Sequence, residues 1–271
     1  MPKAQCSKKK YEGVCKKYVR ILTSPEMQGR HWEQAGGRKA ARWILSQLNK
    51  SCDLAFFDNL PGTNKGKSPN VVGMLEGDLR GSLVITAHYD HLGGTGRCHY
   101  PGADDNASGV AVMLCLAREL CSLPREVRHT CVFVGFTGEE FGMAGSKHAA
   151  RWMLSSAGNN VDCLINMDMV GRASSTRRIL FGESHGDRST REDLTESAQR
   201  AGLEIKWDHH KDWLNLSDQK SFLGMCPCIL VSTESHADYH KLSDTSDKID
   251  YGLLGRLVCA LLGVCSYRDN E

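Results

Sequence analysis

The feature that most constrains the fold is an alternation of short apolar runs with segments of helical spacing, from about residue 80 onward. Residues 108–122, 143–156, 190–202 and 246–267 have the composition and spacing of helices. The apolar runs have the length of buried strands, and they cover residues 81–90, 130–138, 161–171, 177–182 and 226–233. Alternating strands and helices imply a largely parallel sheet sandwiched by helices. We therefore predict an α/β fold, a three-layer α/β/α sandwich with a mostly parallel mixed central sheet.

The upstream part of the chain is expected to add to the same sheet. Residues 36–50 have helical spacing, and residues 54–59 and 70–77 resemble the edge strands of a hairpin. The sequence contains no internal repeat, low-complexity tract or linker. Residues 1–271 are therefore predicted to form a single domain.

Charge and hydropathy exclude several classes of partner. The chain has 34 Lys and Arg against 32 Asp and Glu, so its net charge of +2 gives no basic field for nucleic acid or an anionic membrane. It contains no apolar run of about 18 residues, as a transmembrane helix would need. Residues 1–20 lack the apolar segment of a signal peptide. The chain as it stands is expected to be cytoplasmic, or extracellular or periplasmic if a signal peptide has been removed.

Cysteine is the unusual component, with 12 residues. The sequence has no CxxC pair, which argues against a structural zinc finger. Cys115, Cys131, Cys163 and Cys259 lie in apolar runs, where a thiol behaves as a small hydrophobic group. Most cysteines are therefore expected to be reduced core residues. An isolated disulfide, for example within the Cys226-Pro-Cys228 segment, is the alternative.

Acidic side chains and imidazoles follow the predicted strands. In open α/β sheets, ligands bind beyond the carboxyl ends of the strands. The residues at these ends, together with the loop before the helix at 108–122, are His88, Asp90, His91, Asp104, Asp105, Glu139, Glu140, Asp168, His236, Asp238 and His240. Their convergence on one edge of the sheet is a stronger signal than any one of them.

Each of these residues also has a structural interpretation. Asp105 could cap the following helix, and adjacent glutamates such as Glu139 and Glu140 are often solvated. Asp168 is harder to explain in this way, because an unpaired charge in so apolar a run is costly. Together the residues offer nitrogen and oxygen ligands without a thiolate, which suits a catalytic zinc or related divalent site. Their number suits two ions, with one glutamate left as a general base.

Seven segments of the sequence carry a family resemblance. They are SPEMQGR, NVVGMLEG, ITAHYDHLG, PGADDNASG, GFTGEEFGMAGS, INMDMVGR and DYHKLSDTSDKID, in this order. In order and spacing they resemble the co-catalytic di-zinc aminopeptidases of the bacterial leucyl-aminopeptidase type, which are related to glutamate carboxypeptidases and glutaminyl cyclases. The resemblance covers most of the chain and implies a zinc exopeptidase catalytic domain.

The resemblance also implies a set of metal ligands. His88 and Asp168 correspond to the ligands of one zinc ion, and Glu140 and His240 to those of the other. Asp105 corresponds to the carboxylate that bridges both ions. The implied cofactor is two zinc ions per chain, although nitrogen and oxygen ligands also admit manganese or cobalt.

The remaining implied roles concern catalysis. Glu139 corresponds to the general base and proton shuttle, which takes the proton of the water that attacks as a metal-bridging hydroxide. Asp90 corresponds to the carboxylate that orients the imidazole of His88. Tyr239 is a candidate for substrate contact or support of the oxyanion. The implied substrates are peptides with a free N-terminus, and the oligomeric state could be a monomer or a homodimer.

Two departures from the family pattern stand out. The gap before the metal motifs is too short for the protease-associated insert that many relatives carry. Gln219 stands where the family often has histidine, in Ser217-Asp218-Gln219.

Other functions of the same fold stay open. A carboxypeptidase or dipeptidase would need an arginine for the terminal carboxylate, and the candidates are Arg97, Arg172, Arg177 and Arg178. A cyclase using one zinc ion and a non-catalytic binding domain are further alternatives. The complete set of five predicted ligands disfavours both.

Overall fold

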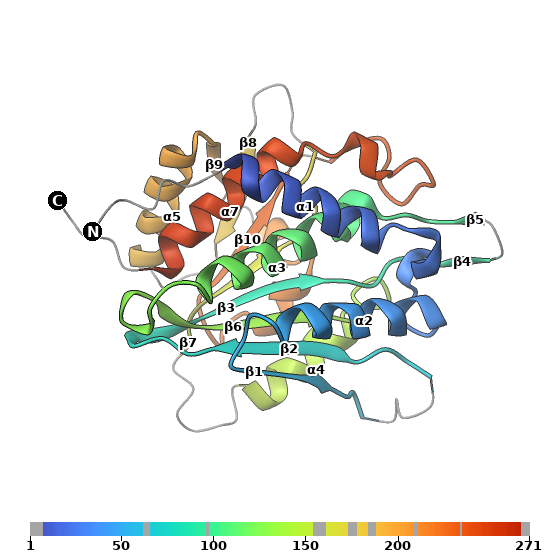
Figure 1. Cartoon of the computed structure of the whole chain (residues 1–271), viewed down its shortest axis with the longest axis horizontal. Helices are drawn as coiled ribbons and strands as arrows, with labels where there is room; N and C mark the ends of the chain where they lie inside the picture. Colours follow the sequence, from blue (N-terminus) through green and yellow to red (C-terminus); the bar gives the residue numbers. More distant parts are fainter. Residues whose placement is uncertain are drawn as a thin grey trace.

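The computed structural model describes residues 8–61, 66–95, 98–153, 161–172, 178–183, 188–208, 211–233 and 235–266. An eight-stranded sheet lies at its centre, in the order β1-β2-β6-β3-β7-β10-β8-β9 (Figure 1). The strands are β1 (Leu54–Asp58), β2 (Asn70–Leu75), β3 (Leu79–His88), β6 (His129–Phe136), β7 (Val161–Met167), β8 (Arg178–Glu183), β9 (Glu204–Asp208) and β10 (Cys228–Ser232). Strands β4 (Gly94–Thr95) and β5 (Cys98–His99) form a separate pair.

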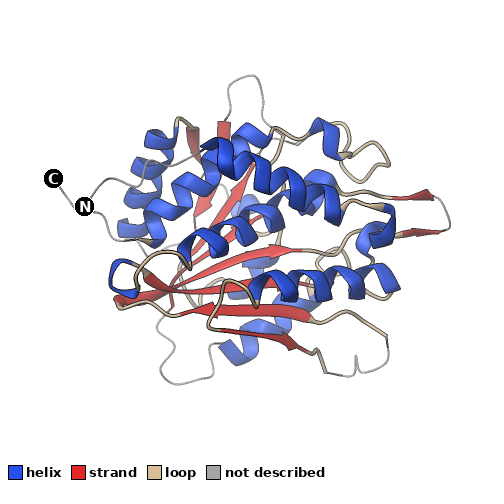
Figure 2. Ribbon diagram, viewed as in Figure 1, coloured by secondary structure: helices blue, strands red, loops and turns tan. Residues whose placement is uncertain are grey.

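Helices cover both faces of the sheet (Figure 2). They are α1 (Lys8–Leu22), α2 (Ala35–Leu48), α3 (Gly109–Leu120), α4 (Ala144–Met153), α5 (Arg188–Ala201), α6 (Lys211–Leu214) and α7 (Tyr251–Cys265). Short helical turns include η1 (Pro25–Arg30), η4 (Asp218–Phe222) and η5 (Ser246–Lys248). The predicted α/β/α sandwich is confirmed.

The four central strands, β6, β3, β7 and β10, run parallel to one another. Strand β2 is antiparallel to β6, β1 is antiparallel to β2, and β8 is antiparallel to β10. The sheet is therefore mixed, with a parallel centre. Because these central strands share one direction, the segments that follow them all emerge at the same edge of the sheet.

Side chains along each central strand alternate between two cores, as the period of two requires. In β3, Leu83, Ile85 and Ala87 face the larger core, while Val84 faces the smaller one. The larger core lies under α1, α2, α3, α5 and α7, and the smaller one lies under α4 and η4. In Figure 1, α2, α3 and α7 lie over the near face of the sheet.

Several element boundaries differ from the prediction. The helix expected over residues 246–267 begins only at Tyr251, because η5 precedes it and Asp250 caps it by accepting a hydrogen bond from the backbone N–H of Leu253. Strand β2 is antiparallel to β1 as predicted, but it also pairs with β6, so of these two strands β1 alone lies at an edge of the sheet. Helix α1 and strand β9 were not predicted.

Two expectations from composition can be compared with the structure. Within the described ranges, no helix combines the length and the apolarity needed to cross a bilayer. Cys226 and Cys228 are thiols whose sulfur atoms lie 4.0 Å apart, not a disulfide. The expectation that Cys259 is reduced was wrong, because this residue is disulfide-bonded. At 9% exposed, Cys259 is more accessible than the buried thiols Cys115 and Cys131.

Candidate metal centre

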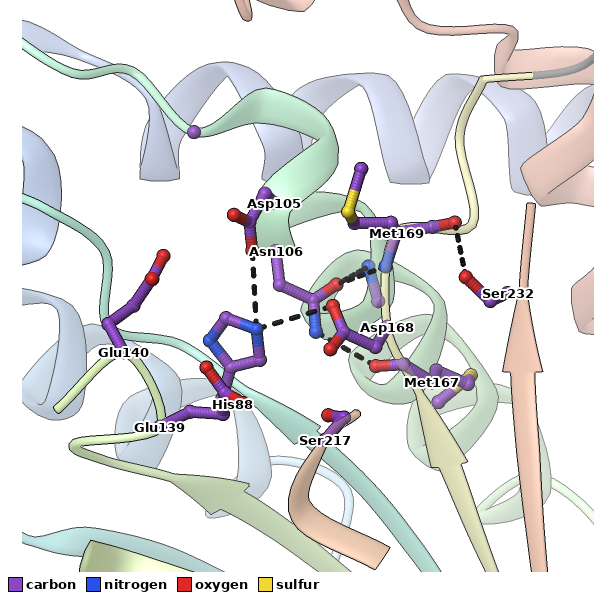
Figure 3. Close-up of polar contacts among 12 residues, drawn as sticks. His88, Asp105, Asn106, Glu139, Glu140, Met167, Asp168, Met169, Ser217 and Ser232 are labelled. Carbon is purple, nitrogen blue, oxygen red and sulfur yellow. Dashed lines mark hydrogen bonds and ion pairs between the residues drawn. The ribbon is translucent and has the colours of Figure 1, made fainter. Parts of the chain in front are cut away.

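The predicted ligands meet at the edge where the parallel strands end. His88 is the last residue of β3, and Asp168 directly follows β7. Glu140 lies in the loop after β6, and Asp105 lies in a kinked turn that leads into α3. Figure 3 shows the imidazole of His88 in contact with both Asp105 and Asp168, and it shows Glu140 on the other side of His88 from Asp168. His240 reaches the same place from the segment between β10 and α7.

The donor atoms form two groups that share Asp105. In the first, Nε2 of His88 lies 3.3 Å from Oδ1 of Asp105 and 3.3 Å from Oδ1 of Asp168. In the second, Nε2 of His240 lies 3.2 Å from Oδ2 of Asp105 and 3.0 Å from Oε2 of Glu140. One oxygen of Asp105 therefore belongs to each group, as expected of a bridging carboxylate.

These separations fit a pair of divalent ions. Two donors bound to one tetrahedral zinc ion at about 2.0–2.1 Å lie about 3.3–3.4 Å apart. Oδ2 of Asp105 and Nε2 of His240 are buried and make no hydrogen bond. Buried polar atoms almost always have a partner. The absence of one here is explained if these atoms are ligands.

The charges of the centre depend on its neighbours. Burial would raise the pKa of Asp105, but contacts with His240 and His88 hold it well below its usual value. Burial likewise opposes protonation of His88, yet the carboxylates of Asp168 and Asp105 raise its pKa well above the usual value. Without an ion, the imidazoles therefore serve as the counter-charges of the carboxylates. A divalent ion would take over that function.

The two glutamates after β6 are held largely away from water. Burial raises the pKa of Glu139 to about 10, and the nearby carboxylates of Asp218 and Asp168 add to this effect. Burial and the charge of Asp105 raise the pKa of Glu140 to about 8. Both carboxyl groups therefore lie where an added positive charge would strongly favour ionisation.

Asp90 lies between His88 and the loop that carries Glu139. Its Oδ1 atom lies 3.7 Å from Nδ1 of His88, which is too long for a hydrogen bond, and its backbone oxygen is nearer at 3.2 Å. The carboxylate instead accepts a hydrogen bond from the backbone N–H of Glu139. The sequence indicated only the first of these contacts.

The sequence places His91 among the residues after the first central strand and implies no role for it, but the structure brings it into the centre. Its Nδ1 atom lies 2.7 Å from Oε1 of Glu140 and 3.7 Å from Oδ2 of Asp105. The ring is completely buried, and its Nε2 atom has no hydrogen-bond partner. Its position three residues after His88 was the available signal.

A second polar network supports the centre from behind. Asp244 accepts hydrogen bonds from the backbone N–H groups of Asp104 and Asp105. Asp104 in turn contacts Nε2 of His236 at 3.1 Å. Asp104 therefore supports the centre through His236, which lies in the same segment as His240. Asp105, which the resemblance implies as the bridging residue, instead faces both donor groups.

The arginines considered for a terminal carboxylate differ in their surroundings. Arg172 forms an ion pair with Asp238, with 2.7 Å between Nη2 and Oδ2. Arg97 and Arg177 lie outside the described residues, and Arg178 is described only as the first residue of β8. Tyr239, the substrate-contact candidate, stacks on the ring of His240 at 3.8 Å and is 46% exposed.

A chain of side-chain hydrogen bonds, here called the floor of the centre, is formed around Asn166 in β7. Asn166 accepts from the hydroxyl of Thr86 and donates to Ser217 and Gln219. Gln219 completes the chain by donating to the backbone oxygen of Leu214. Ser217 lies below His88 and Asp168 in Figure 3. The glutamine that departs from the family pattern is thus a structural part of this floor.

Comparison with known proteins assigns the family. Residues 70–264 match the sequence model of peptidase family M28. The chain belongs to peptidase family M28. A probable leucine aminopeptidase of Arthroderma otae is 26% identical over 163 residues, which are 56% of this chain and 43% of that protein. The chain spans less than half the length of such curated relatives.

Solved structures share the fold of this member of the M28 family. LapB from Legionella pneumophila superposes with a TM-score of 0.80 at 21% identity, covering 97% of this chain and 74% of LapB. BSAP, a zinc aminopeptidase from Bacillus subtilis, superposes with a TM-score of 0.77 at 16% identity, covering 96% of both chains. At these identities the likeness establishes the fold alone.

Proposed function

We propose that the chain is a di-zinc aminopeptidase that removes the N-terminal residue from peptides with a free N-terminus. The observation that carries the proposal is the geometry of Asp105, whose two oxygens face two separate donor groups. His88 and Asp168 would hold one ion with it, and Glu140 and His240 the other. The family match and the names of the relatives support the peptidase activity.

When bound, zinc ions at this position supply the Lewis acidity that polarises a peptide carbonyl and acidifies an attacking water. Glu139 is the carboxyl group left over for proton transfer. It would take the proton of the attacking water and return it to the leaving amine. Its burial suits this function, because a carboxyl group in a dry site holds a proton near neutral pH.

Asp90 and Tyr239 have supporting roles in this proposal. Asp90 fixes the loop of the base through the backbone N–H of Glu139. Tyr239 is half-exposed beside His240, where its hydroxyl group can meet a substrate. Residues 1–271 would act as one catalytic domain without a protease-associated insert.

The test combines metal content with hydrolysis by the Glu139→Gln variant. We expect two zinc ions per chain in both proteins, and a loss of nearly all turnover in the variant. Wild-type rates in the variant would contradict the assignment of the base. Absence of tightly bound metal in the wild type, purified without chelator, would contradict the metal centre itself.

Blocked substrates separate the proposal from its main alternative. Leucyl, alanyl and arginyl peptides should be cleaved when their amine is free and not when it is acetylated. Cleavage of the acetylated peptides from the C-terminal end would favour a carboxypeptidase. The ion pair of Arg172 with Asp238 disfavours that outcome, since this arginine already has a carboxylate partner.

A further inference from the structure

Two imidazoles contact the carboxylate of Glu140, one at each oxygen. Nδ1 of His91 lies 2.7 Å from Oε1, and Nε2 of His240 lies 3.0 Å from Oε2. The two rings lie 5.9 Å apart, centre to centre, and meet edge to face. Only His240 was predicted as a ligand, so the contact of His91 needs a separate explanation.

The distances separate a ligand from a hydrogen-bond donor. Donors on one tetrahedral zinc ion lie about 3.3–3.4 Å apart, and the contacts of His88 and His240 with Asp105 are close to this value. The 2.7 Å between His91 and Glu140 is much shorter and is typical of a hydrogen bond to an ionised acceptor. At 3.7 Å, His91 is also distant from the shared oxygen of Asp105.

We propose that His91 is a positioning residue for Glu140, whose Oε1 atom it holds through its Nδ1–H group. This leaves Oε2 alone to bind the ion shared with His240 and Asp105. The inference rests on the proposed function and adds to it a residue that is not itself a ligand. Binding through one oxygen keeps a coordination position open for substrate, as a catalytic zinc site requires.

The surroundings of His91 keep its ring in place. The ring is completely buried, and Gly102 lies directly against it. A Cβ atom on Gly102 would lie 2.5 Å from Cδ2 of His91, so only glycine allows this approach. Gly102 also has a positive φ of 56°, which other residues rarely adopt. The Nδ1–H group therefore has a fixed direction towards Glu140.

Three substitutions test the proposal by moving or removing the donor. His91→Asn places an amide N–H near the position of Nδ1, His91→Gln places it near Nε2, and His91→Ala removes it. Zinc and cobalt titrations of the chelator-treated proteins give the number and affinity of the ions. The absorption spectrum of bound cobalt reports the coordination number, independently of activity.

We expect the wild type and His91→Asn to bind two ions with similar affinity. His91→Gln and His91→Ala should bind one of them about 10- to 100-fold more weakly, as is typical when the partner of a ligand is lost. Their cobalt spectra should change at that ion only. His148→Gln is a matched control, because His148 contacts Asp58 and not the proposed ligands.

The remaining outcomes overturn the proposal in distinct ways. Equal loss of the ion in all three variants would make the imidazole itself a ligand. Unchanged binding in all three would remove any role for His91. If the wild type binds no ion, the proposed function falls as well. Melting temperatures in chelator check folding, and if His91→Ala does not fold, the comparison of the Asn and Gln variants decides.

Discussion

The carboxylate of Asp90 accepts a hydrogen bond from the backbone N–H of Glu139, with 3.1 Å between Oδ1 and N. This contact joins the loop after β3 to the loop after β6. Asp90 is completely buried, so water does not compete for the bond. The position of the proposed base is therefore coupled to the strand that carries His88.

Replacing Asp90 should impair turnover more than metal binding. In Asp90→Ala the N–H group of Glu139 loses its acceptor, and we expect kcat to fall about 10- to 100-fold, as for other residues that support a metal centre. Asp90→Asn keeps an acceptor oxygen and should lose less. Steady-state kinetics of variants with measured zinc content test this. A wild-type kcat in Asp90→Ala would contradict the coupling.

Arg30 should contribute strongly to stability. Its guanidinium group is completely buried and donates to the backbone oxygens of Tyr89, Leu22, Pro101 and Gly102 at 2.7–2.8 Å. Burial lowers its pKa to about 10, so it stays charged at neutral pH. One unsatisfied buried acceptor costs roughly 1–3 kcal/mol, so we expect Arg30→Met to lose at least about 3 kcal/mol of unfolding free energy.

Urea denaturation of the chelator-treated proteins measures this loss without a contribution from bound metal. Arg42→Met is the control, because Arg42 is exposed on α2 and its substitution should change stability by less than about 0.5 kcal/mol. Arg30→Lys should be intermediate, since an ammonium group has fewer donors. Equal stability of the Met variants at positions 30 and 42 would refute the expectation.

The sequence predicted that the candidate ligands would meet, because strand direction alone brings them together. His88 and Asp168 end apolar runs, and parallel strands carry such residues to one edge. No pattern of this kind identifies His91 or the contact of Asp90 with Glu139. Both depend on how the loops fold after the strands end, which single-sequence periodicity does not describe.

Helix α1 shows a different limit of prediction. Its buried face is formed by residues at helical spacing, namely Tyr11, Cys15, Tyr18, Val19 and Leu22. Lysines and an arginine fill most other positions, so the segment has a low overall hydropathy that masks this face. The position of the helix is decided by packing against α7 and α3, which lie far away in the sequence.

The ion-free protein should lose stability as the pH rises. The folded pKa values of about 10 for Glu139 and about 8 for Glu140 exceed the unfolded value of about 4.3. As the pH rises, the unfolded state therefore releases these protons before the folded state does. The resulting stabilisation is complete below about pH 4.3, and it is lost progressively up to about pH 8 for Glu140 and about pH 10 for Glu139. Glu139→Gln removes one of these ionisations and should flatten the profile.

Melting temperatures between pH 5 and 9 in the presence of chelator measure this effect. At pH 8 we expect Glu139→Gln to be more stable than the wild type by about 1–3 kcal/mol. The comparison isolates Glu139 from other groups that titrate in the same range, such as Asp218, whose pKa burial raises to about 7. Parallel profiles for the two proteins would refute the prediction.

Binding of zinc should release protons near neutral pH. A carboxyl group must be ionised to act as a ligand, and in the ion-free protein the pKa of Glu140 is about 8. Calorimetric titrations at pH 7 in buffers of different ionisation enthalpy give the number of protons released. Glu140→Gln should release fewer protons and bind one ion more weakly, whereas a substitution of the exposed Glu33 should change neither. Zinc binding without proton release would show that Glu140 is not a ligand. Asp105 would then bind one ion and would not bridge two.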